Sequence, residues 1–292
     1  MPRTLNLAVG STCSLPGDLA GNLDQIEQLA AQAGRMDSDL LLTPEMSATG
    51  YGGFPEVLAL AEPAGDGPVY QRLARLARTY HLVLLAGFVE RSGGRRFLGH
   101  YAVYPDGSFV VQRKQRVTPR EYPLESPVDL YFDETEDIGH VRPGEEQFTF
   151  FDVKGVRCGV VICADLGVRT RNAVFSRAGV DLLLLPTGAG GTREERFETR
   201  QLLNEEGRQR YYQSMQPACF PGDGILECIR ERRAMAAVNL CGYDGRVFYH
   251  GGQGSIVNCF GDVVGLLAGI PTIERARPRI AFGSIDFDEK LA

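Results

Sequence analysis

The chain has 292 residues, 43% of them hydrophobic and 23% charged, and 31 Lys and Arg against 37 Asp and Glu give a net charge of −6. This composition excludes a disordered chain, which would carry fewer apolar groups and a larger charge imbalance. The acidic balance argues against nucleic-acid and membrane partners, because both require a basic surface. A small-molecule substrate fits this charge better.

The amino-terminal residues lack the long apolar core of a signal peptide, and apolar runs such as 82–86 and 182–185 are far shorter than the ~20 residues of a membrane span. We therefore expect a soluble, cytoplasmic protein. Its seven Cys include no C-x-x-C pair, which argues against a disulfide framework and a zinc ribbon. We expect unpaired thiols. Cys158 and Cys163, five residues apart along a predicted strand, should face opposite sides of its sheet.

The first half of the chain alternates between helical and strand-like apolar spacing. Leu23, Ile26 and Ala30 share one face of a predicted helix, which Gly34 is suited to end. In chain order, the expected elements are a strand at 5–9, a helix at 18–35, a strand at 39–42, a helix at 69–80, and strands at 82–89, 97–104 and 109–111.

The second half begins with an acidic, Pro-containing stretch at 118–146, which is long enough to suggest a functional loop. The expected elements that follow are strands at 148–153 and 156–162, a helix at 168–178, a strand at 181–185, helices at 192–213 and 225–233, and strands at 236–240, 255–258, 263–267 and 279–286. No linker or repeat divides the sequence, so we expect one domain over residues 1–292. Helices alternating with strands and hairpins predict an α/β layered sandwich.

Three polar residues follow apolar strands at the same structural place. Glu45 follows the strand at 39–42, Lys114 follows the strand at 109–111, and Cys163 follows the strand at 156–162. Ligand crevices of open α/β sheets form at such carboxyl ends. A carboxylate, an ammonium and a thiol meeting there would supply a base, an oxyanion stabiliser and a nucleophile. Taken singly, each has an ordinary alternative, because free Cys is often a core residue and charges are common on surfaces.

Four segments resemble the nitrilase superfamily, the carbon–nitrogen hydrolases, and they occur in the family's order. Glu45 lies in LLTPEMSATGYG, Lys114 in VYPDGSFVVQRKQRVTPREYP, and Cys163 in GVRCGVVICADLGVRTRNAVFSRAGVDLLLLPTGAG. The closing segment, AAVNLCGYDGRVFYHGGQGSIVNCFGDVV, contains Asn239. Each match alone is weak, but four in order favour a catalytic interpretation of Cys163. The resemblance implies the α-β-β-α sandwich of the nitrilase type.

The sequence departs from the family pattern after the cysteine. Ala164 stands where an aromatic residue is common, and Val168, Arg169 and Thr170 replace the usual Phe-Pro-Glu. The segment ECIRERRAMAAVN likewise replaces an Arg-Ala-x-Glu-Asn run. The resemblance therefore implies a Glu-Lys-Cys triad without indicating a subfamily or a substrate.

The resemblance also implies the role of each residue. Glu45 would accept the proton of Cys163, give it to the leaving nitrogen and later activate water. Lys114 and the backbone N–H of Ala164 would hold the oxyanion.

A second glutamate often orients the lysine or the substrate in this family. Glu121 is our first choice for it and Glu136 our second. The resemblance implies no metal and no organic cofactor, and the four His have no metal-ligand spacing. It also implies a homodimer or a larger homo-oligomer.

Tyr51 and Thr187 are candidate substrate-binding residues, because Tyr51 follows the glutamate and Thr187 precedes the Gly-rich turn at 188–191. Packing in the core or a loop is the alternative for each. The favoured function is hydrolysis of a small amide through a thioacyl-enzyme, with release of ammonia or an amine and a carboxylic acid. The alternatives are a nitrile hydrolase or acyl transferase on the same fold, and a non-catalytic scaffold.

Overall fold

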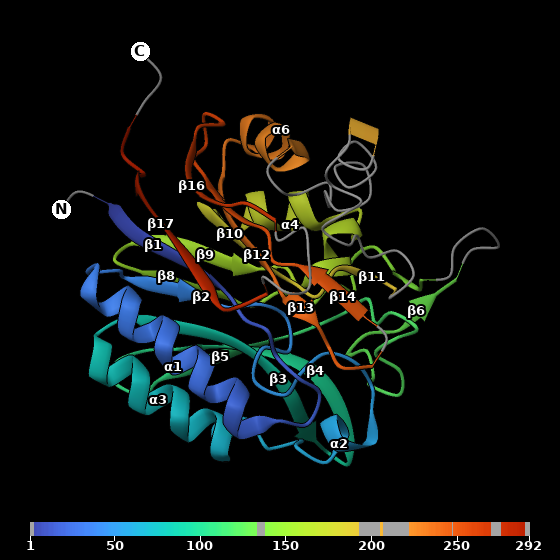
Figure 1. Ribbon diagram of the computed structural model, residues 1–292. Coiled ribbons are helices and arrows are strands. Elements are labelled where there is room, and N and C mark those ends of the chain that lie inside the picture. The colour runs from blue at the N-terminus through green and yellow to red at the C-terminus, as the bar shows by residue number, and fades with distance from the viewer. Residues whose placement is uncertain are drawn as a thin grey trace.

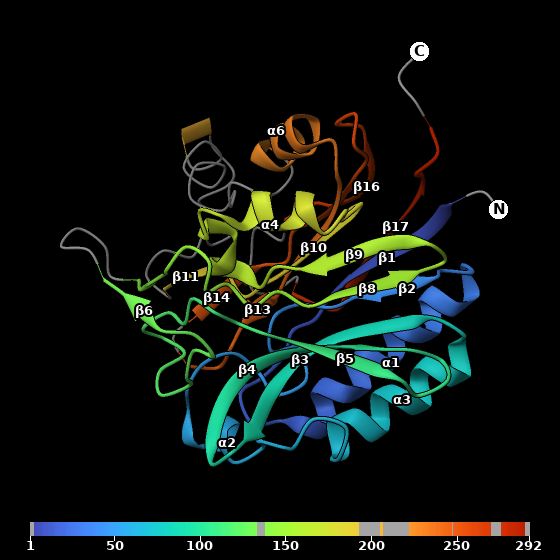
Figure 2. The same ribbon diagram turned by 180° about the vertical axis from the view of Figure 1, so that it is seen from behind.

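The computed structural model describes residues 3–132, 138–192, 205–206, 222–246, 248–269 and 276–289. Two six-stranded sheets lie face to face with helices outside them, so the layers run helix, sheet, sheet, helix (Figure 1). The view from behind shows that the described helices outside the two sheets lie on opposite sides of the molecule (Figure 2). They are α1 (Leu19–Arg35) and α3 (Pro68–Tyr80) on one side, and α4 (Arg171–Arg177) and α6 (Gly222–Glu231) on the other. This arrangement confirms the predicted α-β-β-α sandwich.

The first sheet has the strand order β17-β1-β2-β3-β4-β5. Its strands are β1 (Thr4–Ser11), β2 (Leu40–Leu42), β3 (Val83–Ser92), β4 (Arg95–Val103), β5 (Phe109–Arg113) and β17 (Arg279–Asp286). β1, β2 and β3 pair in parallel, whereas β4 is antiparallel to both β3 and β5. β5 therefore runs in the same direction as β2, and both end at the same edge of the sheet.

The second sheet follows the same plan, with the order β16-β15-β12-β10-β9-β8. Its strands are β8 (Phe150–Val153), β9 (Val156–Val160), β10 (Leu182–Thr187), β12 (Ala234–Asn239), β15 (Gly254–Val257) and β16 (Val263–Leu267). β9, β10 and β12 are parallel, and antiparallel strands flank them. Each sheet thus has three parallel strands whose carboxyl ends share one edge, which is where ligand sites form in such sheets.

Short elements complete the described structure. They are α2 (Pro55–Leu58), the pair β6 (Leu130–Tyr131) and β7 (His140–Val141), the 3₁₀-helix η1 (Cys163–Gly167), and a small sheet of β11 (Gly190–Thr192), β14 (Phe248–Gly251) and β13 (Cys241–Tyr243). None of these was predicted from the apolar pattern of the sequence.

The predicted helices and strands that fall on described residues are present, with ends shifted by a few positions. The predicted helix at 192–213 lies almost entirely outside the described residues. The predicted strand at 156–162 ends instead at Val160, so Cys163 lies beyond it, in η1. The expectation that Cys158 and Cys163 occupy opposite faces of one strand was therefore wrong.

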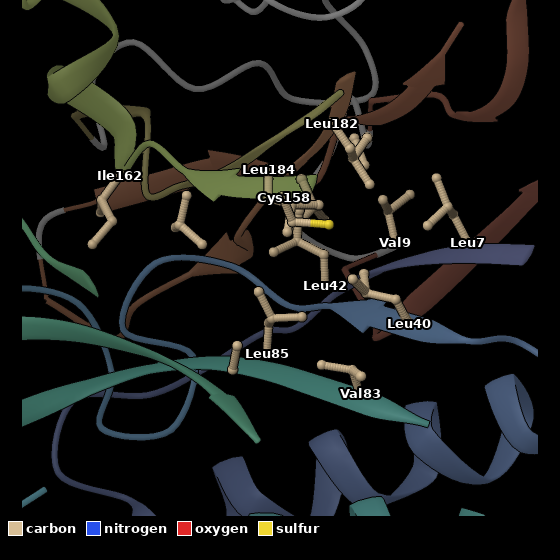
Figure 3. Packing of buried hydrophobic residues seen from close by; sticks show 14 of the residues in the cluster. Leu7, Val9, Leu40, Leu42, Val83, Leu85, Cys158, Ile162, Leu182 and Leu184 are labelled. Atoms are coloured by element: carbon tan, nitrogen blue, oxygen red, sulfur yellow. The ribbon is translucent and has the colours of Figure 1, made fainter. Parts of the chain in front are cut away.

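Alternate residues of the central strands face two different cores. In β2, Leu40 and Leu42 pack between the sheets, whereas Leu41 packs beneath the helices α1 and α3. Figure 3 shows Leu42 pointing from the first sheet toward Cys158 and Leu184 of the second. Each fully buried leucine contributes roughly 1.5–3 kcal/mol, so this layer holds the two sheets together.

Cys13 and Cys241 form a disulfide, which corrects the expectation that the thiols are unpaired. The two residues are 228 positions apart and join the segment after β1 to β13. The N–H of Cys241 also donates to the carbonyl of Thr12 at 2.9 Å. Cysteine spacing could not indicate this pair, because the fold alone brings the two segments together. Four other described cysteines are free: Cys158, Cys163, Cys228 and Cys259.

No helix among the residues described above is long and apolar enough to cross a membrane.

Candidate active site

Glu45 lies in the turn after β2, at the carboxyl edge of the first sheet. Hydroxyl groups hold this turn: Thr43 Oγ1 lies 2.8 Å from Ser47 Oγ, which accepts from the N–H of Gly87 at 3.2 Å. Only glycine fits at position 87, because a Cβ there would lie 2.1 Å from the backbone nitrogen of Met46. The close approach to β3 keeps the side chain of Glu45 fully buried.

Lys114 follows β5 and places a cation between two carboxylates. Its Nζ donates to Glu45 Oε1 at 2.7 Å and to Glu121 Oε1 at 2.5 Å, and all three side chains are 0% exposed. Burial alone would lower the pKa of Lys114, but the charges of Glu121 and Glu45 hold it well above its usual range. The ammonium therefore stays charged. Because burying ions costs free energy even when they are paired, such a cluster is poor evidence for a stabilising role and points to chemistry.

Glu121 is held by three donors. Besides Lys114, Tyr51 Oη donates to Oε1 at 2.9 Å and the N–H of Thr118 donates to Oε2 at 2.9 Å. The structure thus places Glu121, the first choice for the second glutamate, against the lysine. The second choice, Glu136, lies outside the described residues.

Cys163 begins η1 directly beyond β9. Its φ of 48° is in the left-handed region, which is uncommon for a residue other than glycine and clusters at functional sites. Burial raises the pKa of the Cys163 thiol well above its usual range, and the charge of Glu45 raises it further. Lys114 and the backbone N–H of Gly188 act in the opposite direction. The resting thiol is therefore protonated and needs an adjacent base to become a nucleophile.

Glu45 is in position to be that base. Burial raises its pKa to about 7, although Lys114 and the neighbouring Cys163 thiol lower it. Oε1 holds Lys114, whereas Oε2 has no hydrogen-bond partner among the described residues. A Cβ added to Gly188 would lie 3.0 Å from Oε2. A carboxyl group with a pKa near neutrality can both accept and return a proton.

The three predicted pocket residues have different surroundings. Ala164 is half-buried and directly follows Cys163 in η1. Tyr51 is buried, and its ring would lie 2.6 Å from a Cβ added to Gly188. Thr187 ends β10, and its hydroxyl donates to the carbonyl of Val238 at 3.3 Å. The hydroxyl of Thr187 is therefore bonded to the neighbouring strand β12, while Gly188 is the residue that lies against Glu45 and Tyr51.

Several residues of the site could not be assigned from sequence. The ring of His250 meets Tyr51 edge-on at 5.6 Å between centroids, and that of Phe248 meets it at 6.2 Å. Burial lowers the pKa of His250 to about 4, so it is neutral, and its Nδ1 lies 3.2 Å from the carbonyl oxygen of Ala189. Both rings come from β14, which lies in the closing segment that resembles the family, but the resemblance gave neither ring a role. Asp165 is buried beside the site, two positions after Cys163, within the segment that resembles the family's cysteine segment.

Across the described ranges, no group of three or more His, Cys, Asp and Glu residues is arranged to hold a metal ion. The arrangement of Glu45, Lys114 and Cys163 is instead suited to acyl transfer, since it brings together a thiol, a base and a cation.

Residues 6–206 match the family model of the carbon-nitrogen hydrolases. A Pseudomonas protegens protein described as a hydrolase in the pqqF 5′ region is 32% identical over 63% of this chain and 60% of its own. An (R)-stereoselective amidase of Pseudomonas sp. is 28% identical over 59% of this chain and 56% of its own. The chain thus matches less than two thirds of the length of either relative.

The fold resembles that of an amidase from Nesterenkonia sp. AN1, solved as a mutant in complex with butyramide. The TM-score is 0.69, with 19% sequence identity, over 97% of this chain and 92% of that one. At this identity the likeness concerns the fold, and the family model supplies the relationship. The chain belongs to the carbon–nitrogen hydrolase family of the nitrilase superfamily.

Proposed function

We propose that this protein hydrolyses a small amide, with Cys163 as nucleophile, Glu45 as base and Lys114 as oxyanion stabiliser. The observation that carries the proposal is the buried ammonium of Lys114 bonded to Glu45, with the Cys163 thiol beside that same carboxylate. An amide is favoured over a nitrile because one matched relative is an amidase and the structural neighbour holds butyramide.

In the first step Glu45 takes the proton from Cys163 Sγ, and the sulfur attacks the carbonyl carbon. The C=O electron pair moves to oxygen, and the oxyanion is stabilised by Lys114 and the backbone N–H of Ala164. When the oxyanion collapses, the C–N bond breaks and Glu45 donates its proton to the leaving nitrogen. Ammonia or an amine departs and a thioester remains on Cys163.

In the second step the same carboxylate acts on water. Glu45 takes one proton from a water molecule, whose oxygen attacks the thioester carbon. The C–S bond breaks, the carboxylic acid leaves, and the proton returns to sulfur. A pKa of about 7 suits Glu45 to this repeated exchange near neutral pH. Glu121 keeps Lys114 charged and in place throughout.

The proposal is tested with a panel of small aliphatic and aromatic amides. We expect ammonia release by the wild type and an acyl adduct on Cys163, located by mass spectrometry of the quenched enzyme. Cys163→Ala should abolish both. Cys158→Ala is the matched control, because Cys158 is a buried free thiol in the core between the sheets.

Full turnover by Cys163→Ala would disprove the mechanism. Product analysis separates the related reactions, since a nitrile hydrolase forms an acid from a nitrile and an acyl transferase forms a new amide when an amine is supplied. Lack of turnover across all three substrate sets, with thiols that resist alkylation, would favour the non-catalytic scaffold.

A further inference from the structure

Asp165 is a buried carboxylate that the proposed reaction does not use. It lies in η1, two residues after Cys163. The backbone N–H of Gln115 lies 3.1 Å from each of its oxygens, and the N–H of Arg116 donates to Oδ1 at 2.7 Å. These two donors directly follow Lys114. One carboxylate therefore joins the turn that carries the thiol to the segment that carries the ammonium.

A second contact joins the same two segments. The guanidinium of Arg116 lies over Gly167, where an added Cβ would be only 2.0 Å from Nη1. Gly167 is the last residue of η1. The turn and the segment after β5 are thus joined by the hydrogen bonds of Asp165 and pack closely where Arg116 covers Gly167.

The surroundings of Asp165 keep its carboxylate ionised, so that it can accept hydrogen bonds. Burial raises the pKa of Asp165 to about 6, while Lys114 and the N–H groups of Arg116 and Gln115 lower it. At neutral pH the group is charged and accepts both hydrogen bonds. A buried N–H left without an acceptor costs about 1–3 kcal/mol, so the two donors hold their positions only while Asp165 faces them.

We infer that Asp165 is a positioning residue, whose carboxylate fixes the Lys114 ammonium relative to the Cys163 thiol. This inference rests on the proposed function, in which Lys114 stabilises the oxyanion formed when Cys163 attacks. Glu121 and Glu45 orient the Nζ of Lys114, and its backbone N–H donates to the carbonyl of Leu98 on β4 at 2.8 Å. Asp165 holds the next two residues, where the chain leaves the strand and turns toward Cys163. A misplacement of about 1 Å can cost on the order of 100-fold in rate.

The experiment compares Asp165→Ala and Asp165→Asn with Ser126→Ala. Asn keeps one oxygen, which can serve as Oδ1 for both N–H groups. Ser126 Oγ donates to the carbonyl of Gln115 at 2.7 Å, so its removal loosens the same segment without touching the Cys163 turn. Three quantities are measured: kcat and KM for an amide that the wild type hydrolyses, the rate of Cys163 alkylation by iodoacetamide, and the urea midpoint of unfolding.

We expect Asp165→Ala to lower kcat about 100-fold with little change in KM. Alkylation of Cys163 should slow as well, because a displaced ammonium no longer lowers the pKa of the thiol. Asp165→Asn should restore most of both rates, and Ser126→Ala should keep wild-type values. The inference is overturned if Asp165→Ala keeps wild-type kcat, if Ser126→Ala loses as much, or if Asp165→Asn is as impaired as Asp165→Ala.

Two precautions keep the outcomes separate. If Asp165→Ala does not fold, Asp165→Glu takes its place, because it keeps the charge but moves the carboxylate oxygens. The kcat of Asp165→Glu must then be lower than that of Asp165→Asn. The reverse order would contradict the positioning role. Alkylation needs no turnover. A wild type without hydrolysis, but with alkylation slowed by Asp165→Ala, would therefore refute the proposed function and leave the positioning role standing.

Discussion

Cys158 and Cys163 are five positions apart, yet they belong to two different parts of the space between the sheets. Cys158 lies in the apolar middle, among residues such as Leu42 and Leu184. Cys163 lies at the carboxyl edge, beside Glu45 and Lys114. Burial raises the pKa of both thiols. Cys158 is buried and Cys163 half-buried, but the larger difference lies in their neighbours: Cys163 has beside it a carboxylate and an ammonium, which the proposed mechanism uses as base and oxyanion stabiliser.

After the loss of the nucleophile itself, the largest expected effect comes from removing the cation at the carboxyl edge. Lys114→Met should lower turnover about 100- to 1,000-fold, the usual loss for one oxyanion donor. It should also destabilise the fold by about 3–5 kcal/mol, because Glu45 and Glu121 would remain buried without a counter-ion. Amide kinetics and urea unfolding measure the two effects.

Lys154→Met is the matched control, since Lys154 is an exposed lysine that pairs with Asp39. It should leave turnover unchanged. If Lys114→Met kept wild-type kcat, the cation at the carboxyl edge would have no catalytic role. The comparison of the two thiols would then lose its basis.

The disulfide gives the next largest effect, because it joins the segments that follow β1 and β12 at the carboxyl edges of the two sheets. Cys13→Ser and Cys241→Ser should each lower the free energy of unfolding by about 2–4 kcal/mol, and the double variant should lower it no further. Denaturant unfolding with and without a thiol reductant measures this. Cys259→Ser, at a half-buried free thiol, is the control. A wild-type midpoint that reductant does not change would argue against the bond.

The pH dependence should report the shifted carboxyl group. Because the pKa of Glu45 is raised from 4.5 to about 7, the base is protonated below neutrality. kcat/KM should therefore fall about tenfold per pH unit below about 7. The same shift favours the folded state when Glu45 is protonated, so its contribution to stability is full below 4.5 and is lost as the pH rises through about 7. An acid limb near 4.5 would contradict the shift.

The smallest effect is expected in the apolar middle. Cys158→Ala removes one buried sulfur and should cost about 1 kcal/mol of stability, as the loss of a small apolar group does. Turnover and the extent of alkylation at Cys163 should not change. Loss of activity without unfolding would show that the two parts of the space between the sheets are coupled, contrary to the comparison.

Some of the site could be predicted from sequence, because its side chains follow apolar strands and lie in segments that resemble the family in the family's order. Glu45, Lys114 and Cys163 each come after such a strand, and the topology places their strand ends at corresponding edges of the two sheets. The periodicity of the helices and central strands likewise indicated the layered fold. For the helices and strands one local pattern carries the information, whereas for the three site residues the order of four segments does.

The rest depends on contacts that leave no local pattern. Asp165 accepts from backbone N–H groups, which every residue except proline supplies, so no partner side chain marks its role. Gly188 matters because of what a Cβ there would touch. Thr187 was predicted to bind substrate because it lies beside this turn, but its hydroxyl donates to the carbonyl of Val238 in the neighbouring strand. Cys13 and Cys241 meet only once the chain has folded.

The two oxygens of Glu45 have different surroundings, and this has a kinetic consequence. Oε1 is anchored by Lys114, whereas Oε2 accepts no hydrogen bond from the described residues. Under the proposed mechanism, each proton can arrive and depart through Oε2 while Oε1 stays anchored. The carboxylate then completes both halves of the catalytic cycle without rotating its side chain, so little reorganisation energy is added to either barrier.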